Sequence, residues 1–442
     1  MGHKDTIDMH SISFVDRVKN SNLLRGFMST TVWGGLSKLL TLLVTFYCSN
    51  TLAEEGFGEY SFVKNTLNMI LVISATQFSS LATKFATESL QSEISLKRLF
   101  ILVEFIVGVG VICGITSICM PIDVIQSFTG GNSVAHFVRM MGVLLPAFII
   151  QPIVASIFRG YKQFNRVGIY ETLTSLFLLL LTIAFTRIWG YYGAIYALLI
   201  YYIVNSVVGV VMLWHFNTRT HYIHNATKIH SERYIIWTMV VPVFLMSFVE
   251  APLTWVAQAE MGRRASYAMV GGLSVILSIR YILQILPTYF YQAFIPHATQ
   301  LFAACNHKAY FLKYRQIGFG LTGIFVIVMP LLTLFGRFLL GLYGASYVDL
   351  YPSFVISLII TIIILFSTLL KTNMMIREHQ QLILVMTIVS SLFFVMFFYA
   401  FLHYDVNILN AYLFAQGVQY GVQLVFGLIS YFKDKKLTAL AC

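Results

Sequence analysis

Apolar runs of about 20 residues, separated by short polar segments, recur along the whole chain. A helix needs about 20 apolar residues to cross a bilayer, and the runs lack the short alternating pattern of an outer-membrane barrel. The pattern therefore predicts an all-α integral membrane protein. We expect about twelve transmembrane helices, at residues 27–49, 59–82, 99–120, 136–158, 167–187, 193–215, 235–258, 267–290, 316–336, 350–371, 381–402 and 409–432.

The polar segments predict the orientation and the division of the chain. Alternate connecting segments hold 21 Lys and Arg residues against 5 in the others. By the positive-inside rule, the richer side is cytoplasmic, and both termini lie there. No connecting segment is long enough for a separate catalytic domain. We predict two six-helix lobes, 27–215 and 235–432, with a cytoplasmic N-terminal segment 1–26, a linker 216–234 and a tail 433–442.

A short repeat supports the two halves. The chain reads AEEGFGEYSFV from Ala53 and AEMGRRASYAMV from Ala259. Each segment opens the second helix of a predicted six-helix half. Parallel repeats of six helices are a common plan of transporters, so the position of the repeat predicts a transporter fold with lobes around a central cavity.

Composition agrees with this class. Hydrophobic residues make up 58% of the chain, charged residues 11%, and the mean hydropathy is +0.78. A soluble domain has about 25% charged residues. The net charge of +11 follows from the topology and does not indicate nucleic-acid binding. The chain has no phosphate-binding loop, and its H-x-x-H pair, His221 and His224, lacks further ligands for a metal site. We expect no cofactor and no metal.

Three bases lie inside predicted spans, where each costs about 2.5–3.5 kcal/mol to insert. Lys38, Lys64 and Arg280 are therefore the candidate substrate-binding residues, because buried cations suit an anionic ligand. Other interpretations stay open at this point. Lys38 could pair with Glu104 or Glu250, Lys64 could reach the membrane interface, and Arg280 could pair with Glu250. Glu250 and Glu104 are accordingly candidates either for ion coupling or for charge pairing.

Further polar side chains recur at helical spacing around these charges. Glu250 lies between Pro242 and Pro252, which predicts a bent helix. One stripe contains Lys38, and others contain Lys64, Glu250 or Arg280. The candidate cavity-lining residues on these stripes are Thr41, Asn68, Thr254, Gln258 and Gln284.

Three connecting segments carry a family resemblance: TLAEEGFGEYSF, FRGYKQFNRVGIYE and LLGLYGASYVDLYPS. With the twelve-helix plan, they resemble the multidrug/oligosaccharidyl-lipid/polysaccharide exporter superfamily, and within it the Wzx flippases of O-antigen and other polysaccharides. The resemblance implies a two-lobed fold and a substrate of undecaprenyl diphosphate bearing an oligosaccharide. Related peptidoglycan-precursor flippases place basic residues in helices one, two and eight, the helices that hold Lys38, Lys64 and Arg280 here.

We therefore expect a transporter without covalent catalysis in the bacterial inner membrane. It would move the lipid-linked repeat unit from the cytoplasmic to the periplasmic leaflet by alternating access, with proton or sodium coupling as candidate driving forces. Expected partners are this substrate, membrane lipid and the polymerase and chain-length machinery of the polysaccharide; nucleic acid is not expected. The alternatives are a cation-coupled multidrug exporter of the same superfamily and a membrane polysaccharide polymerase or ligase.

Overall fold

The structure is a computed structural model that describes residues 22–74, 78–89, 93–129, 132–161, 163–220, 237, 240–303, 307–377 and 379–440. This described part is helical and contains no β-strand. The elements are α2 (Asn22–Thr51), α3 (Glu54–Ser74), α4 (Ser79–Ser89), α5 (Glu93–Cys119), α6 (Ile122–Thr129), α7 (Asn132–Gly160), α8 (Phe164–Thr220), α9 (Val241–Arg264), α10 (Tyr267–Ala303), α11 (His307–Tyr343), η4 (Ala345–Leu350), α12 (Tyr351–Ile376), α13 (Gln380–His403) and α14 (Ile408–Leu440).

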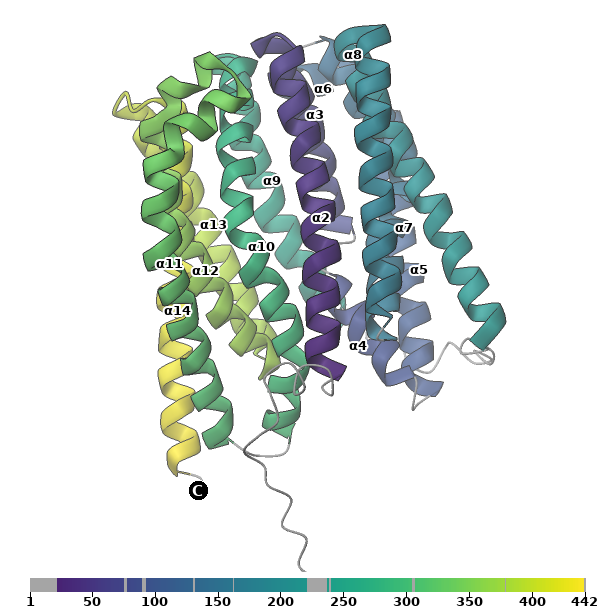
Figure 1. Cartoon of the computed structure of the whole chain (residues 1–442), viewed down its shortest axis with the longest axis vertical. Helices are drawn as coiled ribbons and strands as arrows, with labels where there is room; N and C mark the ends of the chain where they lie inside the picture. The colour runs from purple at the N-terminus through teal and green to yellow at the C-terminus, as the bar shows by residue number, and fades with distance from the viewer. Residues whose placement is uncertain are drawn as a thin grey trace, which may run out of the picture.

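The helices form two lobes that stand side by side (Figure 1). We call α2–α8 the N-lobe and α9–α14 the C-lobe. They meet where α2 and α3 contact α9 and α10. The upper end, as drawn in Figure 1, holds the α2–α3, α9–α10 and α13–α14 junctions, and the lower end holds the C-terminus. The sequence predicts that the upper end faces away from the cytoplasm.

Nine helices in the described ranges are long and apolar enough to cross a membrane. One of them, α8, is 57 residues long, far more than a single crossing needs. It divides at Gly190, whose φ of 57° and ψ of −132° are non-helical and favour glycine. A Cβ on Gly193 would collide with the Phe185 carbonyl, so the two halves of α8 approach closely. The predicted boundary between residues 187 and 193 is confirmed.

Two helices at the lobe contact, α3 and α9, are not among these nine. Both carry several polar residues within their apolar sequences. With α3, α9 and the two halves of α8, the described helices account for the predicted number of spans. Polar character in α3 and α9 thus marks the contact between the lobes.

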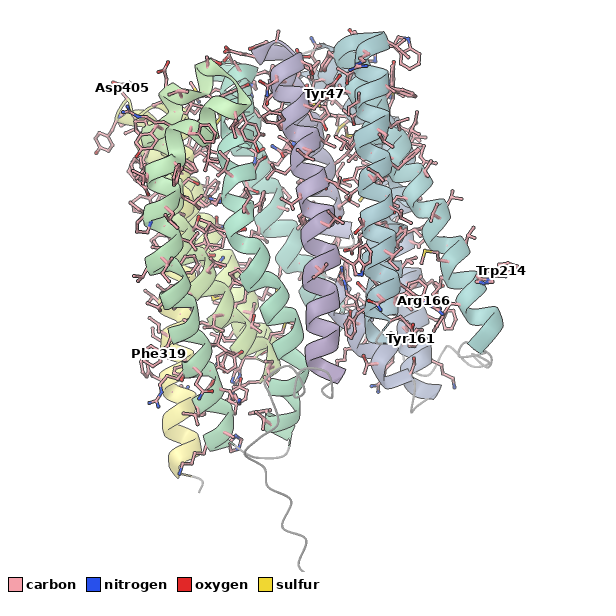
Figure 2. The ribbon with its side chains drawn as sticks, viewed as in Figure 1. Tyr47, Tyr161, Arg166, Trp214, Phe319 and Asp405 are labelled. Atoms are coloured by element: carbon pink, nitrogen blue, oxygen red, sulfur yellow. The ribbon has the colours of Figure 1, made fainter. Side chains whose placement is uncertain are left out.

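Large apolar side chains cover the outside of both lobes. Trp214 on α8 and Phe319 on α11 point away from the bundle on opposite sides (Figure 2) and are 66% and 69% exposed. Exposed apolar side chains of this kind suit contact with lipid. The largest apolar core instead crosses the lobe boundary, with Phe62 of α3 and Val270 of α10 both fully buried.

Several predicted boundaries are wrong. The predicted span 59–82 is two helices, because α3 ends at Ser74 and α4 begins at Ser79. The predicted connecting segment 291–315 is mostly helical, since α10 continues to Ala303 and α11 begins at His307. Hydropathy identifies only the apolar part of a helix that lies in the bilayer, so it does not predict the polar turns by which a helix continues beyond the bilayer. Likewise α8 runs into the predicted linker as far as Thr220, and residues 221–234 with the H-x-x-H pair lie outside the described ranges.

Candidate functional site

The two predicted lysines of the N-lobe lie in one neighbourhood. Lys64 Nζ of α3 donates to Thr45 Oγ1 of α2 at 3.1 Å. Lys38, further along α2, is exposed, and the two ammonium groups are close enough to interact electrostatically. Within the described ranges, neither lysine forms a hydrogen bond or salt bridge with an acidic side chain. Two cations that repel each other and lack an acid form a local positive field suited to an anion.

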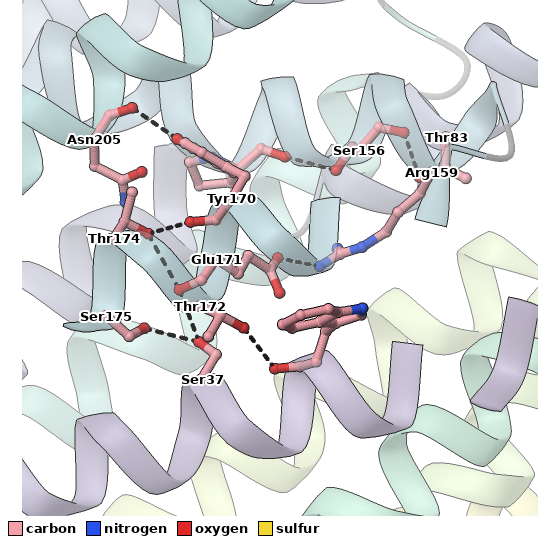
Figure 3. Close-up of polar contacts among 12 residues, drawn as sticks. Ser37, Thr83, Ser156, Arg159, Tyr170, Glu171, Thr172, Thr174, Ser175 and Asn205 are labelled. Atoms are coloured by element: carbon pink, nitrogen blue, oxygen red, sulfur yellow. Dashed lines mark hydrogen bonds and ion pairs between the residues drawn. The ribbon is translucent and has the colours of Figure 1, made fainter. Parts of the chain in front are cut away.

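A hydrogen-bond network fixes the helix that carries Lys38 (Figure 3). Ser37 Oγ donates to the Glu171 carbonyl at 3.1 Å and lies 2.8 Å from Ser175 Oγ. Thr172 Oγ1 donates to the Trp33 carbonyl at 3.0 Å. These bonds hold α2 against α8. Because successive helical residues point about 100° apart, Lys38 leaves α2 on a different side from Ser37.

The same network contains an ion pair. Arg159 Nη2 of α7 lies 2.6 Å from Glu171 Oε1 of α8, and both side chains are partly buried. Tyr170 OH donates to the Asn205 carbonyl at 2.7 Å beside it. Neither Arg159 nor Glu171 is among the candidate site residues predicted from the sequence. The structure assigns the pair to the joint between α7 and α8.

Arg280 lies inside the C-lobe and is only 4% exposed. Its Nη1 donates to Gln416 Oε1 of α14 at 2.7 Å, while its Nε is buried without a hydrogen-bond partner in the described part of the chain. A buried guanidinium of this kind is held by its own lobe. The structure therefore brings Lys38 and Lys64 together and gives Arg280 a separate set of contacts.

The predicted acids have other partners than those considered from the sequence. Glu250 Oε2 lies 3.9 Å from Lys371 Nζ of α12, with both side chains partly buried. The suggested pairs of Glu250 with Arg280 or Lys38 are thus not formed, because α9 presents this carboxylate to α12. Glu104 on α5 is exposed and has no ion pair among the described residues. Pro242 lies at the start of α9 and Pro252 inside it, so only Pro252 interrupts the helix.

The predicted lining residues differ in their surroundings. Thr41 and Thr254 donate to carbonyls of their own helices, at 3.0 Å to Ser37 and 2.9 Å to Ala251. Asn68 is exposed and Gln284 is half-buried. Gln258 is 8% exposed and bridges the lobes.

A buried polar bridge joins α3 to the C-lobe next to Lys64. Asn65 Nδ2 donates to Gln258 Oε1 at 2.9 Å, and Gln258 Nε2 donates to Tyr412 OH at 3.4 Å. Asn65, Tyr412 and Gln416 are not among the residues predicted from the sequence. A signal existed for Gln416, because the segment AQGVQYGVQ places Gln416, Gln419 and Gln423 at helical spacing in an apolar run. In the described structure, these three glutamines are buried.

The lobes are tied together at the upper end. Glu55 of α3 accepts hydrogen bonds from the backbone N–H groups of Tyr267 (3.2 Å) and Ala268 (3.0 Å), at the start of α10. A Cβ on Gly58 would collide with the Tyr267 carbonyl, and Tyr267 OH donates to the Thr129 carbonyl. The two segments of the sequence repeat thus face each other across the lobe boundary.

Further interlobe bonds extend this contact downward. Trp255 Nε1 of α9 donates to Thr66 Oγ1 of α3 at 2.8 Å. Thr66 lies about 18 Å along α3 from Glu54, so the tie covers roughly the upper half of a bilayer core. In the lower part, α5 and α9 meet through the rings of Phe105 and Phe244. The exposed Lys38 and Asn68 come below the upper tie.

The C-lobe also contains an apolar hollow. One of about 370 Å³ lies between α12 and α14 and is lined by Ile356, Ile359, Ile360, Ile363, Phe401, Phe414, Gly417 and Val418. This lining suits hydrocarbon and not a charged headgroup. No group of three His, Cys, Asp or Glu side chains placed to hold a metal occurs among the described residues.

Comparisons with known proteins identify a family and a fold for this chain. Residues 23–302 match the family model of polysaccharide biosynthesis proteins. No curated protein sequence matches. Two solved structures, an outward-facing and an inward-facing conformation of a multidrug resistance MATE transporter of the MOP superfamily, each align with a TM-score of 0.71 at 16% identity. The first covers 95% of this chain and 96% of its own, and the second 91% and 95%.

A third match is a MOP superfamily transporter from Pyrococcus furiosus Vc1, described as having a binding pocket of reverse polarity. It aligns with a TM-score of 0.68 at 16% identity over 95% of each chain. Likeness at this identity establishes the fold, in which helices form two lobes.

Proposed function

We propose a substrate for this chain from the premise that it belongs to the polysaccharide biosynthesis protein family and is a transporter of the MOP superfamily. The proposed substrate is an oligosaccharide repeat unit linked to undecaprenyl diphosphate. The chain would carry it from the cytoplasmic to the periplasmic leaflet of the bacterial inner membrane. Both termini would be cytoplasmic, in agreement with the distribution of basic residues.

One observation carries this proposal: Lys38 and Lys64 lie together on the N-lobe, without an acidic partner among the described residues. A diphosphate offers several anionic oxygens, and each charge-assisted bond to one contributes about 1.5–3 kcal/mol. The lysines would replace the water that the headgroup loses. The polyprenyl tail would stay in lipid, along the apolar outer surface of the bundle (Figure 2).

The tie at the upper end supports a direction of access. With Glu55 holding the start of α10, the periplasmic side of the lobe boundary would be closed in this conformation. The headgroup would then reach Lys38 and Lys64 from the lower, cytoplasmic side. Parting of the upper tie would release it outward, which is alternating access without a covalent step.

Arg280 takes a modified role in this proposal. Its guanidinium is buried against Gln416, so in this conformation it would assist the site from behind and not touch the headgroup. Direct contact would require the lobes to rearrange. Glu250 is the candidate coupling group, because a proton or sodium ion at its carboxylate would compete with Lys371, 3.9 Å away.

The test is to delete the gene and follow lipid-linked repeat units across the inner membrane. We expect units to accumulate in the cytoplasmic leaflet and the wild-type gene to restore their transfer. Normal transfer in the deletion strain would refute the proposed substrate. Increased drug sensitivity with unchanged saccharide transfer would instead identify a multidrug exporter, and altered glycan length with normal transfer would identify a polymerase or ligase.

A further inference from the structure

A line of polar side chains runs from the partly buried Asn65 of the N-lobe into the buried interior of the C-lobe. It begins at Asn65, whose Nδ2 donates to Gln258 Oε1 at 2.9 Å and also contacts Ser274 Oγ at 3.4 Å. Gln258 then donates through Nε2 to Tyr412 OH at 3.4 Å. Gln258 and Tyr412 are 8% and 2% exposed, so an alternative bond to bulk water is not at hand for either side chain.

The line continues to Arg280. Tyr412 and Gln416 are one turn apart on α14, and Gln416 Oε1 accepts from Arg280 Nη1 at 2.7 Å. Tyr412 itself is within electrostatic range of Arg280. One turn further, Tyr420 is within range of both Arg280 and Glu250. A single row of side chains on α14 thus links the lobe boundary to two charged groups of the C-lobe.

Gln258 is the member of this line that the lobe boundary controls. Its carbonyl oxygen accepts from Asn65 across the boundary, while its amide nitrogen donates within its own lobe. If α3 withdraws, Gln258 Oε1 loses its donor, which is unfavourable until another donor takes its place. The Tyr412 hydroxyl can meet this need, because a phenol both donates and accepts. Gln258 would turn its carbonyl toward Tyr412, and the bond between them would reverse direction.

Reversal at Tyr412 has a consequence for Arg280. A Tyr412 hydroxyl that donates to Gln258 has its lone pairs free to accept from a guanidinium. The Nε of Arg280 is buried without a hydrogen-bond partner in the described part of the chain, so this side chain has donor capacity left. It would move toward Tyr412 and loosen its bond to Gln416.

We infer that Gln258 is a positioning residue that couples separation of the lobes to the placement of Arg280, through the Asn65–Gln258–Tyr412 line. The inference rests on the proposed function in one respect only, that the lobes part during transport. It adds a response to lobe position at Arg280, whose hydrogen-bond partner, Gln416, lies inside the C-lobe.

The test measures coupling between two side chains that do not bond to each other. Spin labels at exposed Ala53 and Ser346, in a cysteine-free chain reconstituted in nanodiscs, report the open fraction of the upper end. Asn65→Ala and Tyr412→Phe are made singly and together. We expect the double variant to depart from the product of the single effects on the open-to-closed ratio by about threefold or more, as linked sites do.

A matched control removes an interlobe bond outside the line. Thr66→Val loses the acceptor of Trp255 Nε1, 2.8 Å away, and Thr66→Val with Tyr412→Phe should be multiplicative. Gln258→Leu should abolish the coupling of Asn65→Ala with Tyr412→Phe. If Gln258→Leu does not fold, Gln258→Met, which keeps the side-chain length, takes its place.

Independent effects of Asn65→Ala and Tyr412→Phe, or coupling that persists without Gln258, would overturn the inference. Coupling of equal size with Thr66→Val would do the same, because it would show a general response of the boundary. The label distances need no substrate. A failure of saccharide transfer would therefore refute the proposed function and leave this measurement readable.

Discussion

The charged residues that the sequence places inside membrane spans have different surroundings in the two lobes. In the N-lobe, Lys38 is exposed, and Lys64 donates to the Thr45 hydroxyl without an acidic partner among the described residues. In the C-lobe, Arg280 is buried against Gln416, and Glu250 lies near Lys371. The lysines of the N-lobe thus have no acidic partner among the described residues, whereas Arg280 and Glu250 of the C-lobe have polar or charged partners.

This difference indicates a division of labour. A cation without an acidic partner inside a membrane protein is costly unless a ligand or water meets it, so the N-lobe lysines are suited to binding. A guanidinium and a carboxylate that already have partners of their own are suited to internal switching. The repeat in the sequence gives both lobes a similar helix order, and the chemistry has diverged within that order.

Substitution of the two lysines is the strongest test of this difference between the lobes. Lys38→Ala or Lys64→Ala should reduce transfer of the lipid-linked unit by about 10- to 100-fold, the effect of one lost charge-assisted bond. Initial rates in membrane vesicles measure it. Lys64→Arg, which keeps the charge, should retain much of the rate. If both alanine variants transfer normally while the deletion strain does not, the lysines are not the anion site.

The hydrogen bond between Arg280 and Gln416 should contribute to the stability of the protein. Gln416→Leu leaves the Arg280 guanidinium buried without its acceptor and should lower the free energy of unfolding by about 2–3 kcal/mol. Arg280→Met with Gln416→Leu should recover part of this loss, because no buried charge remains. Unfolding in detergent micelles, followed by tryptophan fluorescence, measures both. A double variant less stable than Gln416→Leu would show that Arg280 is stabilised by other groups.

The upper tie offers a smaller, conformational effect. Glu55→Ala removes two bonds to the backbone of α10 and should raise the open-to-closed ratio of the upper end by about tenfold, which corresponds to about 1.4 kcal/mol. Spin-label distances between Ala53 and Ser346 report this ratio. Glu54→Ala is the matched control: Glu54 is also exposed and forms no hydrogen bond to α10 in the described part. Equal shifts in both variants would argue against a specific role of Glu55.

The two ion pairs allow the finest comparison. Arg159 and Glu171 are 2.6 Å apart within a wider network, whereas Lys371 and Glu250 are 3.9 Å apart, and all four side chains are partly exposed. Arg159→Met should cost about 1 kcal/mol of stability and Lys371→Met about 0.5 kcal/mol. Equilibrium unfolding of each variant tests the order. The reverse order would indicate that the Lys371–Glu250 pair contributes more to stability than its distance of 3.9 Å suggests.

The sequence predicts the membrane helices well because apolar length is a direct requirement of the bilayer. It fails where a helix continues beyond the bilayer, as α10 does to Ala303 and α11 from His307. It also joins α3, which ends at Ser74, and α4, which begins at Ser79, into one span. The kink at Gly190 lies within the predicted gap between residues 187 and 193.

The candidate site is only partly predictable. Helical spacing identifies Lys38 and Lys64 as members of polar stripes, but it cannot tell which helix a stripe faces. Glu250 therefore received Arg280 or Lys38 as a suggested partner, while the fold supplies Lys371 from a helix more than a hundred residues away. The contact of Arg280 with Gln416 has the same origin. Long-range packing determines the partners of Glu250 and Arg280, and this packing cannot be read from the pattern of a single sequence.

Glu55 recognises α10 by its backbone N–H groups and not by side chains. This contact does not depend on the side chain of residue 268, so Ala268 can vary while Glu55 cannot. Tyr267 differs, because its hydroxyl also donates to the Thr129 carbonyl. Most substitutions of Ala268 would leave the contact with Glu55 intact, whereas Ala268→Pro would remove a donor outright. An engineer who wishes to alter the start of α10 can therefore substitute Ala268 without separating the lobes, provided that Glu55 and Tyr267 are kept and proline is avoided.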